Sequence, residues 1–156
     1  MTPEPDAMSL SDRLEAAMRD SMRARDAQRT QTLRMAMAAA HNLKIERRRD
    51  LTDDEVVDVL TKQVKQRRES IEMYRAGGRE DRAVAEEAEA TILAEFLPEQ
   101  LDEAEVEVLA RAAIAETGAS SPADLGRVMG RLAPQTRGRA DGRLVSEVVR
   151  RQLGAG

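Results

Sequence analysis

The sequence predicts an all-α protein, and three observations lead to that prediction. Charged residues make up 35% of the 156 residues, and alanine, leucine, glutamate and arginine are abundant. Apolar residues recur at spacings of three and four, the period of a helix. No window alternates apolar and polar residues for long enough to indicate a strand. Since Tyr74 and Phe96 are the only aromatic residues, the core is expected to be aliphatic.

The first helix is expected to begin near residue 9. Residues 1–8 contain two prolines and little apolar content, and we expect them to be disordered. Ser9 and Asp12 have the spacing of a helix-capping pair. One apolar stripe then follows at a spacing of four: Leu10, Leu14, Met18 and Met22.

Two longer helices are expected next. Residues 28–48 carry one face with Leu33, Met37 and Ala40. Thr52 and Glu55 then have the spacing of a capping box, which predicts the start of a third helix. Its apolar residues continue until Gly77-Gly78 ends it; they are Val56, Leu60, Val64, Ile71 and Tyr74.

A fourth helix is expected over residues 80–96, after which the pattern breaks at Pro98. Its apolar stripe is predicted to consist of Val84, Ala88, Ile92 and Phe96. We place a domain boundary at this break. The expected organisation is an N-terminal domain of about four helices over residues 9–96 and a C-terminal domain over residues 97–153.

Three helices are expected in the C-terminal domain. Asp102 and Glu105 cap the first, and Gly118 ends it. Ser121-Pro122 opens a short helix with the apolar residues Leu125, Val128, Met129 and Leu132. A glycine-broken loop follows, and Asp141 is expected to cap the last helix, which carries Leu144, Val145, Val148, Val149 and Leu153.

The net charge of -4 conceals strong segregation of charge along the chain. Residues 13–49 carry ten basic groups and four acids, a net charge of +6. Residues 79–110 carry eleven acids and two arginines, a net charge of -9. Residues 127–151 carry seven arginines and two acids, a net charge of +5. The chain therefore has a basic segment near each end and an acidic segment between them.

Composition excludes several kinds of site. There is no cysteine, and His41 is the single histidine, so thiolate chemistry and sites with two imidazoles are excluded. No catalytic constellation is found, and no cofactor or metal is expected; four clustered acids, Asp53, Asp54, Glu55 and Asp58, are better explained by a helix start. No apolar run approaches the roughly 20 residues of a membrane span, and the start lacks a signal-peptide pattern. We expect a cytoplasmic protein without membrane contact.

The segment "MGRLAPQTRGRADGRLV", residues 129–145, is the strongest candidate for a functional site. It holds four arginines, three glycines and one acid, Asp141. An arginine can contact a phosphate through two donors, and the amides of a helix N-terminus can do the same. Gly138 permits a positive φ angle and a close backbone approach. The alternative is that these arginines are solvated surface charge.

The segment also carries a resemblance. "GRVMGRLAPQTRGRADGRLVSEVV", residues 126–149, resembles the tail motif of the GatB/YqeY family. "FLPEQLDEAEVEVLARAAIAETGASSPADLGRVMG", residues 96–130, is similar to its stand-alone YqeY branch, and the similarity extends from Met8 to Leu153. The positions shared with the tail motif are Gly126, Val128, Met129, Gly130, Gly138, Arg139, Ala140, Asp141, Leu144 and Val145.

The resemblance implies two helical domains, the second shared with the tail of the B subunit of the aspartyl/glutamyl-tRNA amidotransferase. In that enzyme the tail contacts tRNA, while other parts perform the glutaminase and kinase chemistry; those parts have no counterpart here. The expected function is therefore non-catalytic binding of structured RNA, most directly tRNA. The expected contact residues are Arg127, Arg131, Arg137, Gly138, Arg139 and Arg143.

Two other functions remain open at this point. One is an accessory role in tRNA-dependent amide transfer, beside separate amidotransferase subunits, under the family label of a carbon–nitrogen ligase with glutamine as amide donor. The other is a protein-interaction module that uses the acidic residues 79–110. The sequence gives no indication of the oligomeric state.

Two further features have competing explanations. Gly126 and Gly130 lie four apart in a predicted helix, and close packing of a neighbouring helix is favoured over close approach of an RNA backbone. The basic residues of the N-terminal domain are better explained as a solvated face than as an extended RNA footprint; they include Arg19, Arg23, Arg34, Lys44 and Arg47 to Arg49.

Overall fold

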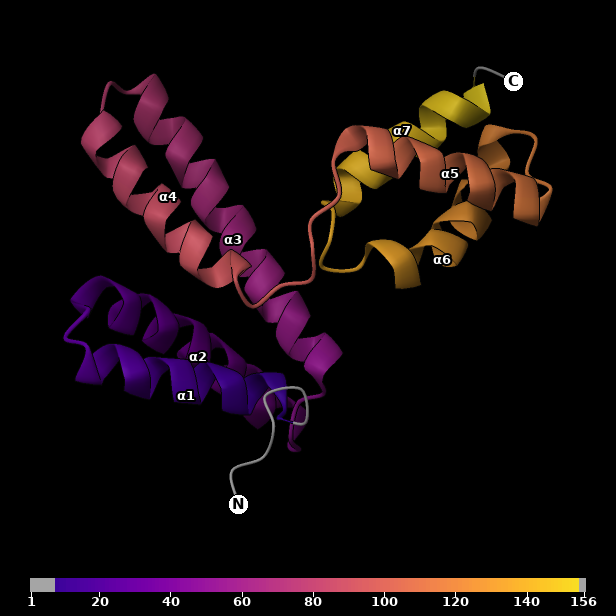
Figure 1. Cartoon of the computed structure of the whole chain (residues 1–156). Helices are drawn as coiled ribbons and strands as arrows, with labels where there is room; N and C mark the ends of the chain where they lie inside the picture. The colour runs from indigo at the N-terminus through magenta and orange to yellow at the C-terminus, as the bar shows by residue number, and fades with distance from the viewer. Residues whose placement is uncertain (1–7, 155–156) are drawn as a thin grey trace. The chain divides into compact units, whose positions relative to one another are not determined.

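The computed structural model describes residues 8–154, and over that range the chain is all-α, as predicted. It forms seven α-helices and one 3-10 turn there, without a strand (Figure 1). The chain divides after Leu97 into two compact units. Residues 1–7, most of the stretch expected to be disordered, lie outside the described residues.

The N-terminal unit consists of two helical hairpins (Figure 1). The first hairpin pairs α1 (Leu10–Arg23) with α2 (Ala27–Arg47). The second pairs α3 (Asp53–Ala76) with α4 (Glu80–Ala94).

Side-chain caps fix where these helices begin. The Ser9 hydroxyl accepts a hydrogen bond from the Asp12 amide at 3.1 Å and starts α1. The capping box predicted for α3 is present: Thr52 accepts from the Glu55 amide, and Glu55 accepts from the Thr52 amide. Each such cap satisfies amides that have no partner within the helix.

The core of the N-terminal unit is aliphatic. Its buried residues come from all four helices: Leu10, Leu14, Leu33, Ala36, Val56, Leu60, Val64 and Leu93. The stripe predicted for α4 is wrong at its first position, because Val84 is 53% exposed whereas Ala83 is buried. The buried face of α4 therefore begins one position earlier than predicted. The prediction failed here because the alanines of α4 leave its apolar face poorly marked in the sequence.

The C-terminal unit contains α5 (Glu103–Thr117), a 3-10 turn η2 (Pro122–Asp124), α6 (Leu125–Thr136) and α7 (Gly142–Gly154). The Asp102–Glu105 capping box opens α5, and Gly118 ends it at φ +66°. The loop expected after Leu132 is shorter than predicted, because α6 continues through Pro134 to Thr136. Leu132 and Thr136 are both buried on one face, so packing holds this last turn although proline removes one helical hydrogen bond.

Packing among α5, α6 and α7 forms the core of this unit. Its buried residues are Val106, Ala110, Ala113, Val128, Leu132, Val145, Val148, Val149 and Leu153. These residues occupy one side of each helix. The arginines of α6 and α7 lie on the opposite, solvent-exposed sides. Within residues 8–154, no helix has the length and apolar character needed to cross a membrane.

Candidate RNA-binding site

The loop between α6 and α7 is held in a fixed conformation by the segment that precedes α5. Gly138 is buried and adopts φ +71°, a conformation that residues with a Cβ rarely adopt. The Gln100 side-chain amide donates to the Gly138 carbonyl at 2.7 Å. The Leu101 amide donates to the Arg139 carbonyl, also at 2.7 Å. Gly138 therefore shapes the loop and is not itself exposed to a ligand.

Arg139 is also directed into the fold. Its Nε donates to the Glu99 carbonyl at 3.0 Å, and its terminal nitrogen donates to the Gln135 carbonyl at 3.1 Å. The side chain thus joins the end of α6 to residues forty positions earlier in the chain. Because its donors are engaged with backbone carbonyls, we assign Arg139 a structural role within the predicted site.

Asp141 is the N-cap of α7, as expected. Its carboxylate accepts from the Arg143 amide at 2.9 Å, and its carbonyl accepts from the Val145 amide at 3.1 Å. One first-turn amide of α7 is therefore already satisfied by a carboxylate. The negative charge of Asp141 at this point disfavours a phosphate on the end of α7.

The arginines of α6 lie on its outer surface. Arg127 and Arg131 are exposed and one helical turn apart. Arg127 pairs with Asp124 at 3.1 Å, and Arg131 pairs with Glu116 on α5 at 2.8 Å. Exposed ion pairs of this kind are worth little in stability. They orient the two guanidinium groups while leaving them accessible to a stronger anion such as a phosphate.

The glycines of α6 face open space. A Cβ placed on Gly126 or Gly130 would meet no atom within 4 Å apart from its chain neighbours and the adjacent backbone of α6 itself. The favoured explanation from the sequence, close packing of a neighbouring helix, is therefore wrong. Both glycines are exposed, and the core side of α6 is formed instead by Val128 and Leu132. The helix consequently presents bare backbone to solvent beside its two arginines.

Four of the six predicted contact residues remain on the surface. Arg127 and Arg131 belong to α6, Arg137 is the C-cap of that helix, and Arg143 lies in the first turn of α7. All four are exposed. We call them the outer arginines. Gly138 and Arg139 lie between them in the chain and build the loop that positions Arg137 and Arg143.

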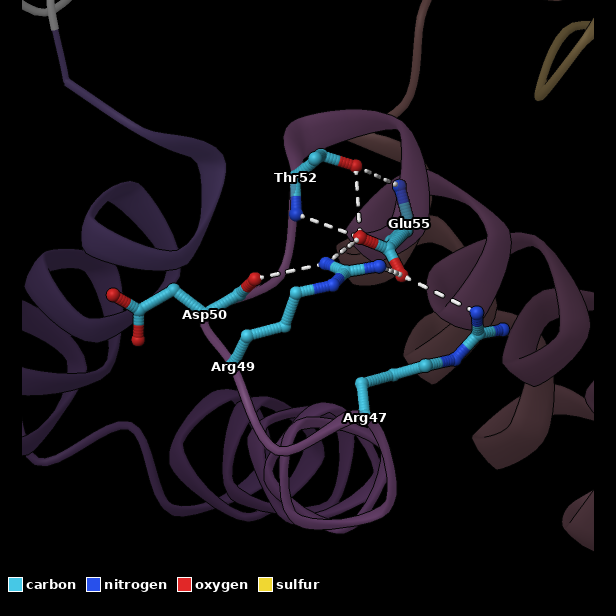
Figure 2. Close-up of polar contacts among 5 residues, drawn as sticks. All are labelled: Arg47, Arg49, Asp50, Thr52 and Glu55. Carbon is cyan, nitrogen blue, oxygen red and sulfur yellow. Dashed lines mark hydrogen bonds and ion pairs between the residues drawn. The ribbon is translucent and has the colours of Figure 1, made fainter.

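Several basic residues of the N-terminal unit form ion pairs with acids of the same unit. Arg19 pairs with Glu15 at 2.9 Å, and Lys44 pairs with Asp50 at 3.0 Å. Between α2 and α3, Arg49 makes two hydrogen bonds to Glu55, with Arg47 at 3.9 Å from the same carboxylate (Figure 2). These pairs offset much of the positive charge that the sequence concentrates there.

Glu55 has the most strongly shifted pKa in this cluster. The hydrogen bond from Arg49, followed by that from the Thr52 amide, lowers the pKa of Glu55 from 4.5 to about 2. The carboxylate is therefore ionised at any physiological pH. Figure 2 shows the carboxylate accepting hydrogen bonds from Thr52 and Arg49, with Arg47 in a longer ion pair, so Glu55 acts as the centre of the cap.

Two acids at the start of α3, Asp53 and Glu55, make structural contacts. Asp53 accepts from the Leu10 amide at 2.9 Å and joins α3 to α1. Within the described part of the chain, no three histidine, aspartate or glutamate side chains are grouped in a way that could hold a metal ion. His41 is an exposed residue of α2.

One buried charge was missed by the sequence analysis. Arg67 on α3 is only 6% exposed. It contacts Glu89 on α4 at 3.3 Å and the Gln63 side chain at 3.0 Å. Its burial could have been predicted from its position, because residue 67 lies on the same helix face as the apolar residues Val64 and Ile71. Its partners place it between the helices of the second hairpin as a structural residue.

Two comparisons relate this chain to known proteins. A family model described as "Yqey-like protein" matches residues 11–153. The chain is also 30% identical over 148 residues to the protein "Altered inheritance of mitochondria protein 41, mitochondrial" of Pyrenophora tritici-repentis (strain Pt-1C-BFP). That match covers 92% of this chain and 80% of the fungal protein.

Proposed function

We propose, from the premise that the chain belongs to the YqeY-like family, that its C-terminal unit binds structured RNA, most directly tRNA. The contacts are made by the outer arginines to phosphates. The binding is non-catalytic, and the other residues of the tail motif maintain the loop between α6 and α7.

The observation that carries this proposal is the separation of roles within one motif. Three residues of the motif have structural roles. Gly138 adopts a positive φ angle, Arg139 donates to a backbone carbonyl, and Asp141 caps α7. By contrast, the side-chain contacts of Arg127 and Arg131 are exposed ion pairs. The chain as a whole has a net charge of -4, yet this surface is basic and its loop is held by internal hydrogen bonds. Such a surface is suited to binding a polyanion.

Recognition of RNA shape is favoured over recognition of bases. The sequence from Pro98 to Gly156 contains no aromatic residue, so the C-terminal unit has no platform for stacking of unpaired bases. Arginines on two neighbouring helices are suited to the regularly spaced phosphates of a folded RNA. The resemblance of this unit to an amidotransferase tail that contacts tRNA supports tRNA as the RNA in question.

A binding assay with total tRNA and a duplex DNA of matched length tests the proposal. The informative variant replaces Arg127, Arg131 and Arg143 with Gln. A matched control replaces Arg13, Arg68 and Arg82, three exposed arginines of the N-terminal unit, and changes the net charge equally. Circular dichroism first confirms that both variants remain helical.

We expect the wild-type chain and the control to bind tRNA, and the variant to lose roughly tenfold or more in affinity at moderate salt. Equal losses in the two variants would mean that net charge alone drives binding. No binding by the wild-type chain at low salt would contradict the proposed function.

A further inference from the structure

We propose that one face of α2 pairs with the same face of a second copy of the chain, with the two helices parallel, so that the protein forms a weak dimer in solution. We call this face, which consists of Met35, Ala38, Asn42 and Ile45, the outer face of α2. The inference goes beyond RNA binding and does not depend on it.

The outer face exposes large apolar side chains along one stripe. Met35 is 51% exposed and Ile45 is 62% exposed. Ala38 and Asn42, which lie between them, are exposed as well. The spacing of the four residues is that of the a and d positions of a coiled coil, with Met35 and Asn42 at a positions. Single exposed apolar residues are common on protein surfaces, whereas a stripe with this spacing is suited to pairing with another helix.

The fold of the N-terminal unit uses other sides of α2. Leu33 and Ala36 are fully buried in its core. Arg29 pairs with Glu95 at the end of α4, at 2.9 Å. From the residues per turn of an α-helix, the outer face lies on the opposite side of α2 from Leu33 and Ala36. Packing within the unit therefore does not account for the apolar residues of the outer face.

Asn42 favours a second copy of the chain as the partner. In parallel two-stranded coiled coils, one Asn at an a position fixes the register and the two-stranded state at a cost in stability. An Asn amide both donates and accepts hydrogen bonds, so it can pair with the same Asn of the other helix. A partner without a polar group at this point would bury the Asn42 amide unsatisfied, which costs free energy. The identical helix supplies the group that is needed.

The charges beside the outer face favour parallel helices. Arg34 and His41 lie along one edge, and Ala39 and Glu46 lie along the other. In a parallel pair, each g residue faces the e residue of the next heptad in the other helix. His41 therefore meets Glu46 of the second copy, while Arg34 meets the uncharged Ala39. In an antiparallel pair the basic edge would meet its own counterpart, which is unfavourable.

The pairing is expected to be weak, because the outer face covers little more than one heptad of α2. It does not require new structure, because α2 is already folded within the N-terminal unit and needs no helix nucleation on association. An interface of this size lies at the low end of those that form in solution. We expect a dissociation constant on the order of 10–100 µM.

Sedimentation velocity of the full chain, from about 5 to about 500 µM, tests the pairing. We expect the wild-type chain to change from monomer to dimer over this range. Ile45→Glu introduces a charge into the stripe and should keep the chain monomeric. Met73→Glu is the matched control, because Met73 is a 75% exposed residue of α3, and this variant should dimerise like the wild type. Circular dichroism first confirms that both variants remain helical.

A charge exchange tests the orientation of the two helices. Glu46→Arg should weaken the dimer roughly threefold or more, because it replaces two favourable contacts with repulsive ones. The double variant His41→Glu/Glu46→Arg restores opposite charges across a parallel pair and should recover most of that loss. Residues 41 and 46 do not face each other within one helix, so a recovery reports a contact between two chains.

A wild-type chain that stays monomeric at every concentration would overturn this inference and leave the outer face to a different partner. Equal losses of dimer in Ile45→Glu and Met73→Glu, or a dimer that survives Ile45→Glu, would overturn the assignment to α2. A double variant that fails to recover would contradict the parallel arrangement. None of these results bears on RNA binding by the C-terminal unit, which the tRNA assay tests separately.

Discussion

Arg139 and Glu99 are joined by a hydrogen bond of 3.0 Å from the arginine Nε to the glutamate carbonyl. The same arginine donates to the carbonyl of Gln135 at 3.1 Å. A basic residue within an arginine-rich motif thus stabilises the loop between α6 and α7. This relationship separates the residues that build the candidate site from those that face a ligand.

Arg139→Ala is expected to destabilise the C-terminal unit by about 1–2 kcal/mol, because it removes two hydrogen bonds from a charged donor. Urea unfolding monitored by circular dichroism measures the change. Arg143→Ala is the matched control and should leave stability within about 0.5 kcal/mol while weakening RNA binding. If Arg139→Ala left stability unchanged and abolished RNA binding, the structural role of Arg139 would be wrong.

Gly138→Ala is expected to cost about 1–2 kcal/mol, because the residue is buried at φ +71°, where a Cβ is strained. The Gln100 contact to the Gly138 carbonyl depends on the same backbone conformation. The loss should appear as a lower urea midpoint of the C-terminal unit. An unchanged midpoint would show that this loop tolerates another conformation.

Gly126→Ala is expected to change stability in the opposite direction, raising it by about 0.5–1 kcal/mol. The added methyl group meets open space in the folded chain, and alanine loses less backbone entropy on folding. The same variant should bind RNA more weakly, because the methyl group holds the ligand away from α6. Gly118→Ala, at φ +66°, is a control that should destabilise. A destabilised Gly126→Ala variant would mean that this face of α6 is not open.

The Arg49–Glu55 contact predicts a pH dependence of stability. The pKa of Glu55 is lowered from 4.5 to about 2 on folding, so its charge favours the folded state fully above pH 4.5. That contribution is lost as the pH falls through 4.5 toward 2. Thermal midpoints of the wild-type chain and Glu55→Gln should therefore differ at pH 7 and converge as the medium is acidified. A gap between the wild-type chain and Glu55→Gln that stays constant over this pH range would contradict this account.

The start of each well-capped helix could be predicted from the sequence. Ser9, Thr52 and Asp102 cap through contacts within three residues, and such contacts are visible as a local pattern. The same locality explains the correct assignment of Asp141. The all-α class followed from the apolar period, which does not depend on how the helices pack.

Features that depend on distant partners could not be predicted. Arg139 and Arg143 are equally good candidates for phosphate contact in the sequence, because the contact of Arg139 with the Glu99 carbonyl exists only in the folded unit. The loop was expected to begin directly after Leu132, whereas packing of Leu132 and Thr136 carries α6 past Pro134. The open space around Gly126 is likewise a property of the packing of α5 and α7 and not of α6 itself.

The salt dependence of tRNA binding tests the central claim most directly. Each phosphate contact contributes about 0.7–0.9 to the slope of the logarithm of the association constant against the logarithm of salt concentration. Replacing Arg127, Arg131 and Arg143 with Gln should therefore reduce the magnitude of that slope by roughly two to three. An unchanged slope would contradict the claim that these arginines contact the phosphates of a bound RNA.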